Sequence, residues 1–346
     1  MSEEKIYFQD KDHRILIIND SVFDTKLIDP RSVDLIITSP PYNVDIEYNT
    51  HDDTISYPEY KKFSKKWMAQ CYEWLKDDGR FCLNIPLDKN KGGHQSVGAD
   101  LTQIAQEVGF KYHTTIVWNE GNISKRTAWG SWQSASAPHV ISPVELIIVL
   151  YKSEWKKTSG SKISDIEKQD FLDCTNGLWK FNGEKKKRIG HPAPFPVELP
   201  RRCMKLFSFK DDIVLDPFLG SGTTLVASYV NDRKGIGIDI DAHYCQIALN
   251  RLKKETTLDS EGYIEPRPLS KKEASKKYLL TQSDLVLQHF KDYPRQQMTY
   301  RDVRDWIKEE VAKGCFKDIK AYEKIMRTLV KEKQIKRLPD GRFVYK

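Results

Sequence analysis

A strand, a glycine-rich turn and a helix follow one another in residues 212–230, and this succession constrains the fold more than any other stretch. Asp212-Ile213-Val214-Leu215 is a short apolar run typical of a buried strand. Asp216–Thr224 supplies the glycine-rich turn, and an apolar run with helical character follows it. This order brings backbone N–H groups at a helix N-terminus close to a polar or anionic cofactor. The sequence therefore predicts an α/β fold with a cofactor site at this turn.

A carboxylate and the pattern of glycines narrow the choice of cofactor. A further short strand, Gly235–Asp239, ends in an acid 23 residues after Asp216. That spacing is close to the one at which a carboxylate meets ribose hydroxyls. The turn has neither the three-glycine dinucleotide pattern nor a Gly-Lys-Ser/Thr ending. Nicotinamide cofactors and nucleoside triphosphates are therefore disfavoured.

A second motif, Thr38-Ser39-Pro40-Pro41-Tyr42, follows the apolar run Val33–Ile37, which has the length of a strand. Ligands of open α/β sheets bind at the carboxyl ends of strands. The two prolines stiffen the turn and leave carbonyl oxygens as acceptors, while Ser39 adds a hydroxyl and Tyr42 a flat ring. These groups suit a flat substrate that carries an exocyclic NH₂ group. The alternative is a simple turn that leaves a strand, but a cofactor site elsewhere in the chain favours the substrate interpretation.

The two motifs, TSPPY and DPFLGSGTT, together resemble those of the S-adenosylmethionine-dependent DNA amino-methyltransferases. The order, with the catalytic motif first, resembles the β group of that family. Val144–Leu150 and His191–Pro196 match as well, and the similarity covers about residues 12–255. The resemblance implies a Rossmann-like methyltransferase sheet with helices on both faces. It also implies S-adenosyl-L-methionine as cofactor and double-stranded DNA as substrate.

The resemblance also implies roles for individual residues. The catalytic residues would be Ser39, Pro40, Pro41 and Tyr42. The target base must leave the duplex, and Tyr42 would stack on it while Ser39 and the Pro40 carbonyl accept the amino hydrogens. The cofactor would contact Asp20, Thr38, His191, Asp216, Pro217, Phe218, Gly220, Ser221, Gly222, Thr223 and Asp239.

Ser39 bears on which base is methylated. Many adenine-N6 enzymes of this family have Asp or Asn at this position, whereas the Thr-Ser-Pro-Pro-Tyr form resembles the cytosine-N4 enzymes. We therefore expect N4 of cytosine to be the target. A serine hydroxyl can accept a hydrogen bond from either amino group, so N6 of adenine stays open as the alternative.

Two hydrophilic segments and one aromatic helix lie within the predicted methyltransferase domain, residues 1–262. Residues 152–190 read as a short target-recognition insert, in which Lys187 and Arg188 would contact phosphates. Residues 119–138 interleave Ser, Thr and Gln with tryptophans, including Trp132, and we expect a functional loop near the flipped base, with buried tryptophans as the alternative. The spacing of aromatic residues in 57–75 predicts a helix that packs on the core.

The positive charge of the chain is concentrated in its tail. The whole chain has a net charge of +7, whereas residues 271–346 contain 20 Lys and Arg against 11 Asp and Glu. Residues 263–280 read as a linker, and residues 281–346 contain three helical stretches and two alternating strands around Pro-Asp-Gly. This pattern resembles a winged-helix-like α+β domain. Its DNA-binding residues would be Lys317, Lys320, Lys324 and Arg327.

The sequence also bears on membrane association, metal binding and partner proteins. No apolar run approaches 18 residues and the first residues are polar, so we expect a cytoplasmic protein without a membrane partner. The six cysteines have no metal-ligand spacing, so we expect no metal site. The resemblance points to a restriction-modification system, with a cognate restriction endonuclease and a homodimer as candidate partners. A non-catalytic winged-helix DNA-binding protein is the alternative of another class.

Overall fold

The computed structural model describes residues 5–41, 56–87, 95–120, 130–138, 144–184 and 195–258, and in the C-terminal part 302, 326–327, 329–331, 335–338 and 343–345. The contacts between residues group the chain into two compact units, Met1–Pro266 and Arg267–Lys346. The limits of the linker and of the winged-helix-like domain stay predictions.

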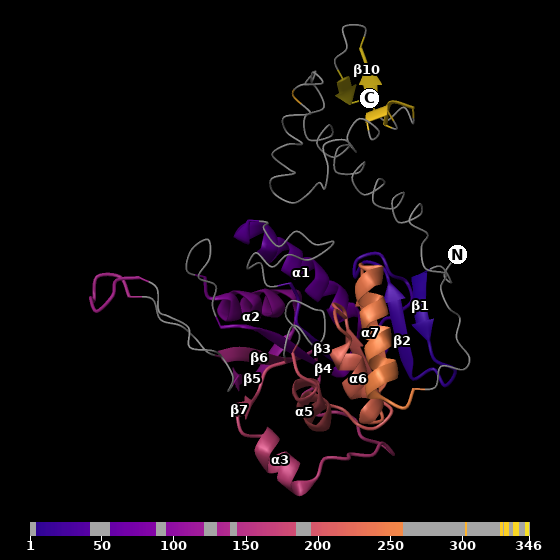
Figure 1. Ribbon diagram of the computed structural model, residues 1–346. Helices are drawn as coiled ribbons and strands as arrows, with labels where there is room; N and C mark the ends of the chain where they lie inside the picture. The colour runs from indigo at the N-terminus through magenta and orange to yellow at the C-terminus, as the bar shows by residue number, and fades with distance from the viewer. Residues whose placement is uncertain are drawn as a thin grey trace. The chain divides into compact units, whose positions relative to one another are not determined.

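Within the described part of the first unit, nine strands form one mixed sheet in the order β1-β2-β9-β8-β3-β4-β6-β5-β7 (Figure 1). The strands from β2 to β4 in this order are parallel, whereas β1 is antiparallel to β2. β6 is antiparallel to both β4 and β5, and β7 is parallel to β5. Their bounds are β1 Ile6–Gln9, β2 Ile15–Asn19, β3 Val33–Thr38, β4 Leu75–Pro86, β5 Lys111–Glu120, β6 Val144–Tyr151, β7 Leu178–Phe181, β8 Ile213–Asp216 and β9 Lys234–Asp239.

Helices cover both faces of this sheet, as the sequence predicted. On one face, α1 and α2 pack against alternate residues of the central strands, with Trp67 and Leu101 in the same cluster as Ile36. On the other face, α5 packs against Leu35 and its neighbours, and α6 and α7 pack against Ile17 of β2. The helix bounds are α1 Tyr57–Trp74, α2 Val97–Val108, α3 Lys168–Cys174, α5 Glu198–Phe207, α6 Thr223–Val230 and α7 Ala242–Glu255.

Local sequence explains where the long helix α1 begins. Ser56 and Glu59 form a reciprocal capping box, and Pro58 occupies the first turn, where a missing N–H costs nothing. The face of α1 that carries Tyr60, Trp67 and its other inward residues is buried, which confirms the predicted core-packing helix. Among the described helices, none combines the length and the apolar character that crossing a bilayer would require.

The second unit is described only in part. β10 (Ile335–Arg337) and β11 (Phe343–Tyr345) pair antiparallel, with Lys336 beside Val344. The two predicted strands around Pro-Asp-Gly are therefore confirmed. Ile335 and Phe343 are buried, so this hairpin has an apolar side.

Candidate active site

Two loops from neighbouring strands meet at the carboxyl edge of the sheet. β3 and β8 run parallel, with Ile36 beside Leu215, so their last residues, Thr38 and Asp216, emerge together. The Thr38 hydroxyl donates a hydrogen bond of 2.8 Å to one carboxyl oxygen of Asp216. Both residues are buried, at 0% and 1% exposure. This bond joins the serine–proline turn to the glycine-rich turn, which lie 178 positions apart in the chain.

Asp216 uses both carboxyl oxygens to hold these turns. The hydroxyl of Thr224 donates to its second oxygen at 2.7 Å, and the backbone N–H of Phe218 donates to the first at 3.1 Å. Burial raises the pKa of Asp216 to about 7, against the opposing effect of the hydrogen bonds from Thr224 and Thr38. The carboxyl group therefore links the two turns at the ends of the paired strands β3 and β8.

Two further acidic residues follow the adjacent strands. Asp239 ends β9 and accepts backbone hydrogen bonds from Gly220 at 2.9 Å and from Asp241 at 2.8 Å. Burial raises the pKa of Asp239 to about 7. Asp20 follows β2 and forms an ion pair with Lys5 at 2.6 Å. Carboxyl groups therefore follow three neighbouring strands at one edge, an arrangement that favours a ligand with positive charge.

The glycine-rich turn has a shape that only small residues allow. Gly220 and Gly222 both have positive φ, of 49° and 76°. A Cβ atom on Gly222 would lie 2.6 Å from the Cβ of Ala248 on α7, closer than real contacts come. The turn is thus packed directly on α7, and it leads into the N-terminus of α6. Its backbone can approach a ligand because no side chain intervenes.

Arg251 is a residue of this site that the sequence did not reveal. It lies on α7, one turn beyond Ala248, and is only 7% exposed. Its guanidinium donates to the hydroxyls of Thr223 at 2.7 Å and Ser221 at 3.3 Å. The Thr223 hydroxyl in turn donates to the Phe195 carbonyl at 3.2 Å. The signal in the sequence is that Arg251 falls on the apolar side of a predicted helix. Because a buried arginine is rarely unpaired, this position implies polar partners inside the protein.

The other predicted site residues divide into those that the structure describes and those that it does not. Ser39, Pro40 and Pro41 continue directly from Thr38 at the carboxyl edge, with Pro40 buried. Pro217 is buried in the glycine-rich turn, and the ring of Phe218 packs edge-on against Trp67, 5.2 Å between centroids. Arg327, in the second unit, is exposed. Outside the described residues lie Tyr42, Lys187, Arg188, His191, Lys317, Lys320 and Lys324.

The described beginning of the predicted recognition insert lies at the opposite, amino edge of the sheet. After β6, Lys157 and Lys162 approach Asp212 at 3.7 and 2.6 Å. Asp165 then pairs with the fully buried Arg233 at 2.6 Å. The chain returns toward the carboxyl edge only through β7, which runs parallel to β5. That residues 152–190 recognise the target stays a prediction, and its first part is held away from Ser39.

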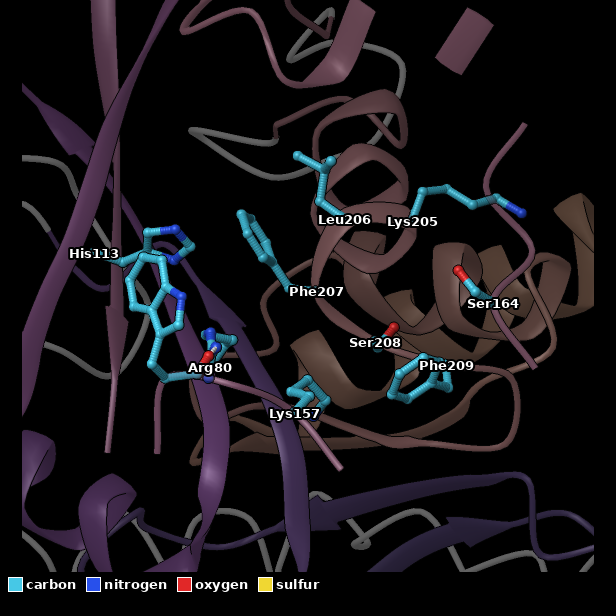
Figure 2. Close-up of a pocket in the computed structure, with 10 residues that line it drawn as sticks. Arg80, His113, Lys157, Ser164, Lys205, Leu206, Phe207, Ser208 and Phe209 are labelled. Carbon is cyan, nitrogen blue, oxygen red and sulfur yellow. Dashed lines mark hydrogen bonds between the residues drawn. The ribbon is translucent and has the colours of Figure 1, made fainter. Parts of the chain in front are cut away.

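A pocket of about 270 Å³ lies at this amino edge. Figure 2 shows His113 of β5 and Arg80 of β4 on one side, with Phe207 at the end of α5 reaching toward them. The rings of His113 and Phe207 are 5.7 Å apart. Burial, together with the charge of Arg80, lowers the pKa of His113. The residues that line the pocket include none of the predicted catalytic or cofactor residues.

Comparison with known proteins places these features in one family. The model of the DNA methylase family matches residues 33–250 of the chain. The Type II methyltransferase M.MjaVI of Methanocaldococcus jannaschii is 60% identical over 175 residues, which cover 51% of this chain and 89% of that protein. The Type II methyltransferase M.HpaI of Haemophilus parainfluenzae is 27% identical over 336 residues, covering 92% and 97%.

A solved structure shares the fold as well. TTHA0409 from Thermus thermophilus, in complex with S-adenosyl-L-methionine, has a TM-score of 0.55 and 25% identity to this chain. The alignment covers 71% of this chain and 95% of that protein. The part in common therefore extends over most of the first unit.

Proposed function

This chain belongs to the DNA methylase family, and we propose that it transfers a methyl group from S-adenosyl-L-methionine to an exocyclic amino group of a base in double-stranded DNA. N4 of cytosine is the favoured target and N6 of adenine the alternative. The observation that carries the proposal is the 2.8 Å hydrogen bond from Thr38 to Asp216. It sets the turn that would hold the amino group beside the turn that would hold the cofactor.

The residues at the carboxyl edge suit this cofactor. When bound, S-adenosyl-L-methionine supplies an electrophilic sulfonium methyl group and carries positive charge. Asp216 and Asp239, when ionised, would offer compensating negative charge, whereas the charge of Asp20 is already paired with Lys5. The carboxyl oxygens of Asp239 retain lone pairs with which to accept from ribose hydroxyls. Gly220 and Gly222 would let the backbone approach it, and the related TTHA0409 was solved with this molecule bound.

The serine–proline turn would act on the substrate. The Ser39 hydroxyl and the Pro40 carbonyl would each accept one amino hydrogen. Two such acceptors favour a pyramidal nitrogen and direct its lone pair away from the ring, which makes the nitrogen a better nucleophile. Pro40 and Pro41 keep the acceptors in place before the substrate arrives, so the contribution is mainly orientation. No covalent bond between protein and substrate is needed.

A base inside a duplex cannot reach this turn. We therefore propose that the target base is flipped out and stacks on Tyr42. Lys187 and Arg188, together with Lys317, Lys320, Lys324 and Arg327 of the tail, would bind phosphates. Such contacts provide affinity but carry no sequence information.

Site specificity and biological setting are also part of the proposal. The relatives named above are Type II methyltransferases, which supports a site-specific enzyme of a restriction-modification system, with a cognate restriction endonuclease as partner. A homodimer remains a further candidate assembly. The alternative, a non-catalytic winged-helix DNA-binding protein, is disfavoured because it would not require both the serine–proline turn and the glycine-rich turn to be intact.

The test is incubation of the full chain with isotopically labelled S-adenosyl-L-methionine and DNA of mixed sequence, followed by nucleoside mass spectrometry. We expect labelled N4-methylcytosine. Labelled N6-methyladenine would establish the alternative base, and the absence of both products, with intact cofactor binding, would contradict the proposal.

A further inference from the structure

Trp132 is the most exposed large apolar side chain in the described part of the chain, with 75% of its surface accessible. The sequence predicted a functional loop, with buried tryptophans as the alternative. For Trp132 the alternative is wrong, because its side chain is exposed. A single exposed apolar residue needs no explanation by itself. The hydrogen bonds of its loop, and the edge of the sheet at which the flanking strands have their ends, indicate a function for Trp132.

The loop 130–138 is held together by its own hydrogen bonds. Ser131 and Ala137 are joined by a backbone hydrogen bond of 3.0 Å, and Gly130 and Pro138 form an isolated bridge. The Ser131 hydroxyl donates to the Ser134 carbonyl at 2.6 Å and accepts from the Ala137 N–H at 2.9 Å. These bonds close a small hairpin and keep its serine hydroxyls occupied. Trp132 directly follows Ser131 within this hairpin, which presents the indole ring without burying it.

The loop lies between β5 and β6 in the chain, and these two strands meet at the carboxyl edge of the sheet. β5 ends at Glu120 and β6 begins at Val144, and Asn119 pairs with Val144. In the neighbouring pair, Pro86 at the end of β4 lies beside Glu145. The strands that precede and follow this loop in the chain therefore have these ends at the edge from which Ser39 extends.

The chemistry of the loop selects its partner. Residues 130–138, GSWQSASAP, contain no charged side chain, so they cannot form ion pairs with phosphates. An indole ring binds other flat rings by stacking, and every base offers such a face. When a target base leaves the duplex, its neighbours lose a stacking partner, and the flat face of an inserted aromatic ring can take its place.

We propose that Trp132 stacks on a DNA base exposed when the target base is flipped out, and so stabilises the opened duplex at the active site. This inference rests on the proposed function. It assigns to the loop 130–138 a contact with the bases, distinct from the phosphate contacts of the basic residues.

The test uses the 346-residue chain and a DNA duplex that the wild-type chain methylates. Trp132→Ala, Trp132→Phe and Trp132→Leu are compared for the KM of DNA, the KM of the cofactor, and DNA affinity by fluorescence anisotropy at several salt concentrations. Tyr112→Ala is the matched control, because Tyr112 is another exposed aromatic residue and lies at the beginning of β5, at the amino edge of the sheet. We expect Trp132→Ala to weaken DNA binding about 10-fold and to raise the KM of DNA similarly.

Three further readouts separate stacking from a structural role. The KM of the cofactor and the salt dependence of DNA binding should be unchanged, because no charge is removed. Trp132→Phe should recover most of the loss, whereas Trp132→Leu, apolar but not flat, should not. Unchanged DNA affinity of Trp132→Ala, or equal recovery by leucine, would overturn the inference. A wild-type protein that yields no methylated nucleoside counts instead against the proposed function, and the affinity comparison still tests Trp132 on duplex DNA.

Discussion

Thr38 donates its hydroxyl to Asp216 across 2.8 Å, between the ends of two adjacent parallel strands. Through this contact a residue beside the serine–proline turn is fixed to a residue of the glycine-rich turn. Substitutions of these residues and of their neighbours should therefore change turnover, cofactor binding or stability in distinct ways.

Thr38→Val keeps the shape of the side chain and removes the hydroxyl. One carboxyl oxygen of Asp216 then accepts only the hydrogen bond from the backbone N–H of Phe218. We expect kcat to fall about 10-fold, with a smaller change in the KM of the cofactor, because a buried hydrogen bond contributes on the order of 1 kcal/mol and the serine–proline turn loses its anchor. The control is Thr102→Val on α2, whose hydroxyl bonds only within its own helix. Equal kcat in both variants would contradict the positioning role of this bond.

Gly222→Ala combines a positive φ of 76° with a Cβ that would lie 2.6 Å from the Cβ of Ala248. We expect the free energy of unfolding to fall by about 3 kcal/mol and cofactor binding to be lost. Gly160→Ala separates the two causes, since Gly160 has a φ of 49° and open space around it. It should cost only about 1 kcal/mol. Chemical denaturation of the two variants makes the comparison, and similar losses would mean that contact with α7 is unimportant.

Arg251→Met removes the donor that holds the hydroxyls of Ser221 and Thr223. We expect the KM of the cofactor to rise about 10-fold and kcat to change less, since the glycine-rich turn is loosened while the serine–proline turn is untouched. Arg251→Lys should restore part of the affinity, because an ammonium keeps a donor for the two hydroxyls, which bond to the same guanidinium nitrogen, but lacks the Nε–H that pairs with Glu255. The exposed Lys254→Met on the same helix is the control. A uniform loss of stability without a change in the KM of the cofactor would assign Arg251 to the core alone.

The pKa of Asp239, raised by burial from its ordinary 3.8 to about 7, makes the protein sensitive to pH. The folded state binds more protons than the unfolded state between these values, so the contribution of Asp239 to stability is present below about pH 4 and is lost as the pH rises through about 7. A cationic cofactor favours the ionised carboxyl, so its affinity should rise over the same interval. Titration calorimetry with S-adenosyl-L-methionine from pH 6 to 8 should show this rise. Asp239→Asn should flatten it, leaving the dependence due to Asp216, whose pKa burial also raises to about 7, and an unchanged slope in that variant would contradict the assignment.

Tyr42→Ala and Asp239→Ala test opposite sides of the site. We expect the first to lower turnover far more than cofactor affinity, because stacking acts on the base. The second should do the reverse, because the carboxyl group would hold ribose. Steady-state kinetics with cofactor and DNA varied separately make the comparison, and equal effects on both quantities would count against these roles.

Local patterns in the sequence determined the succession of strand, glycine-rich turn and helix, the position of the serine–proline turn after a strand, and the aromatic face of α1. These features depend on residues within a few positions of one another, where backbone sterics and apolar periodicity act directly. Together they carried the resemblance to the DNA amino-methyltransferases, and that resemblance implied the family and the sheet with helices on both faces.

Tertiary structure alone decided which of these local elements share an edge. The bond between Thr38 and Asp216 spans 178 positions, and Arg251 reaches Thr223 across 28. Such pairs depend on strand order and on how α7 packs over the turn, and no local pattern encodes either one. The same holds for residues 152–167, whose hydrophilic sequence suits a DNA contact, yet whose charges pair at the amino edge because Asp34, Asp212 and Arg233 are buried there and require partners.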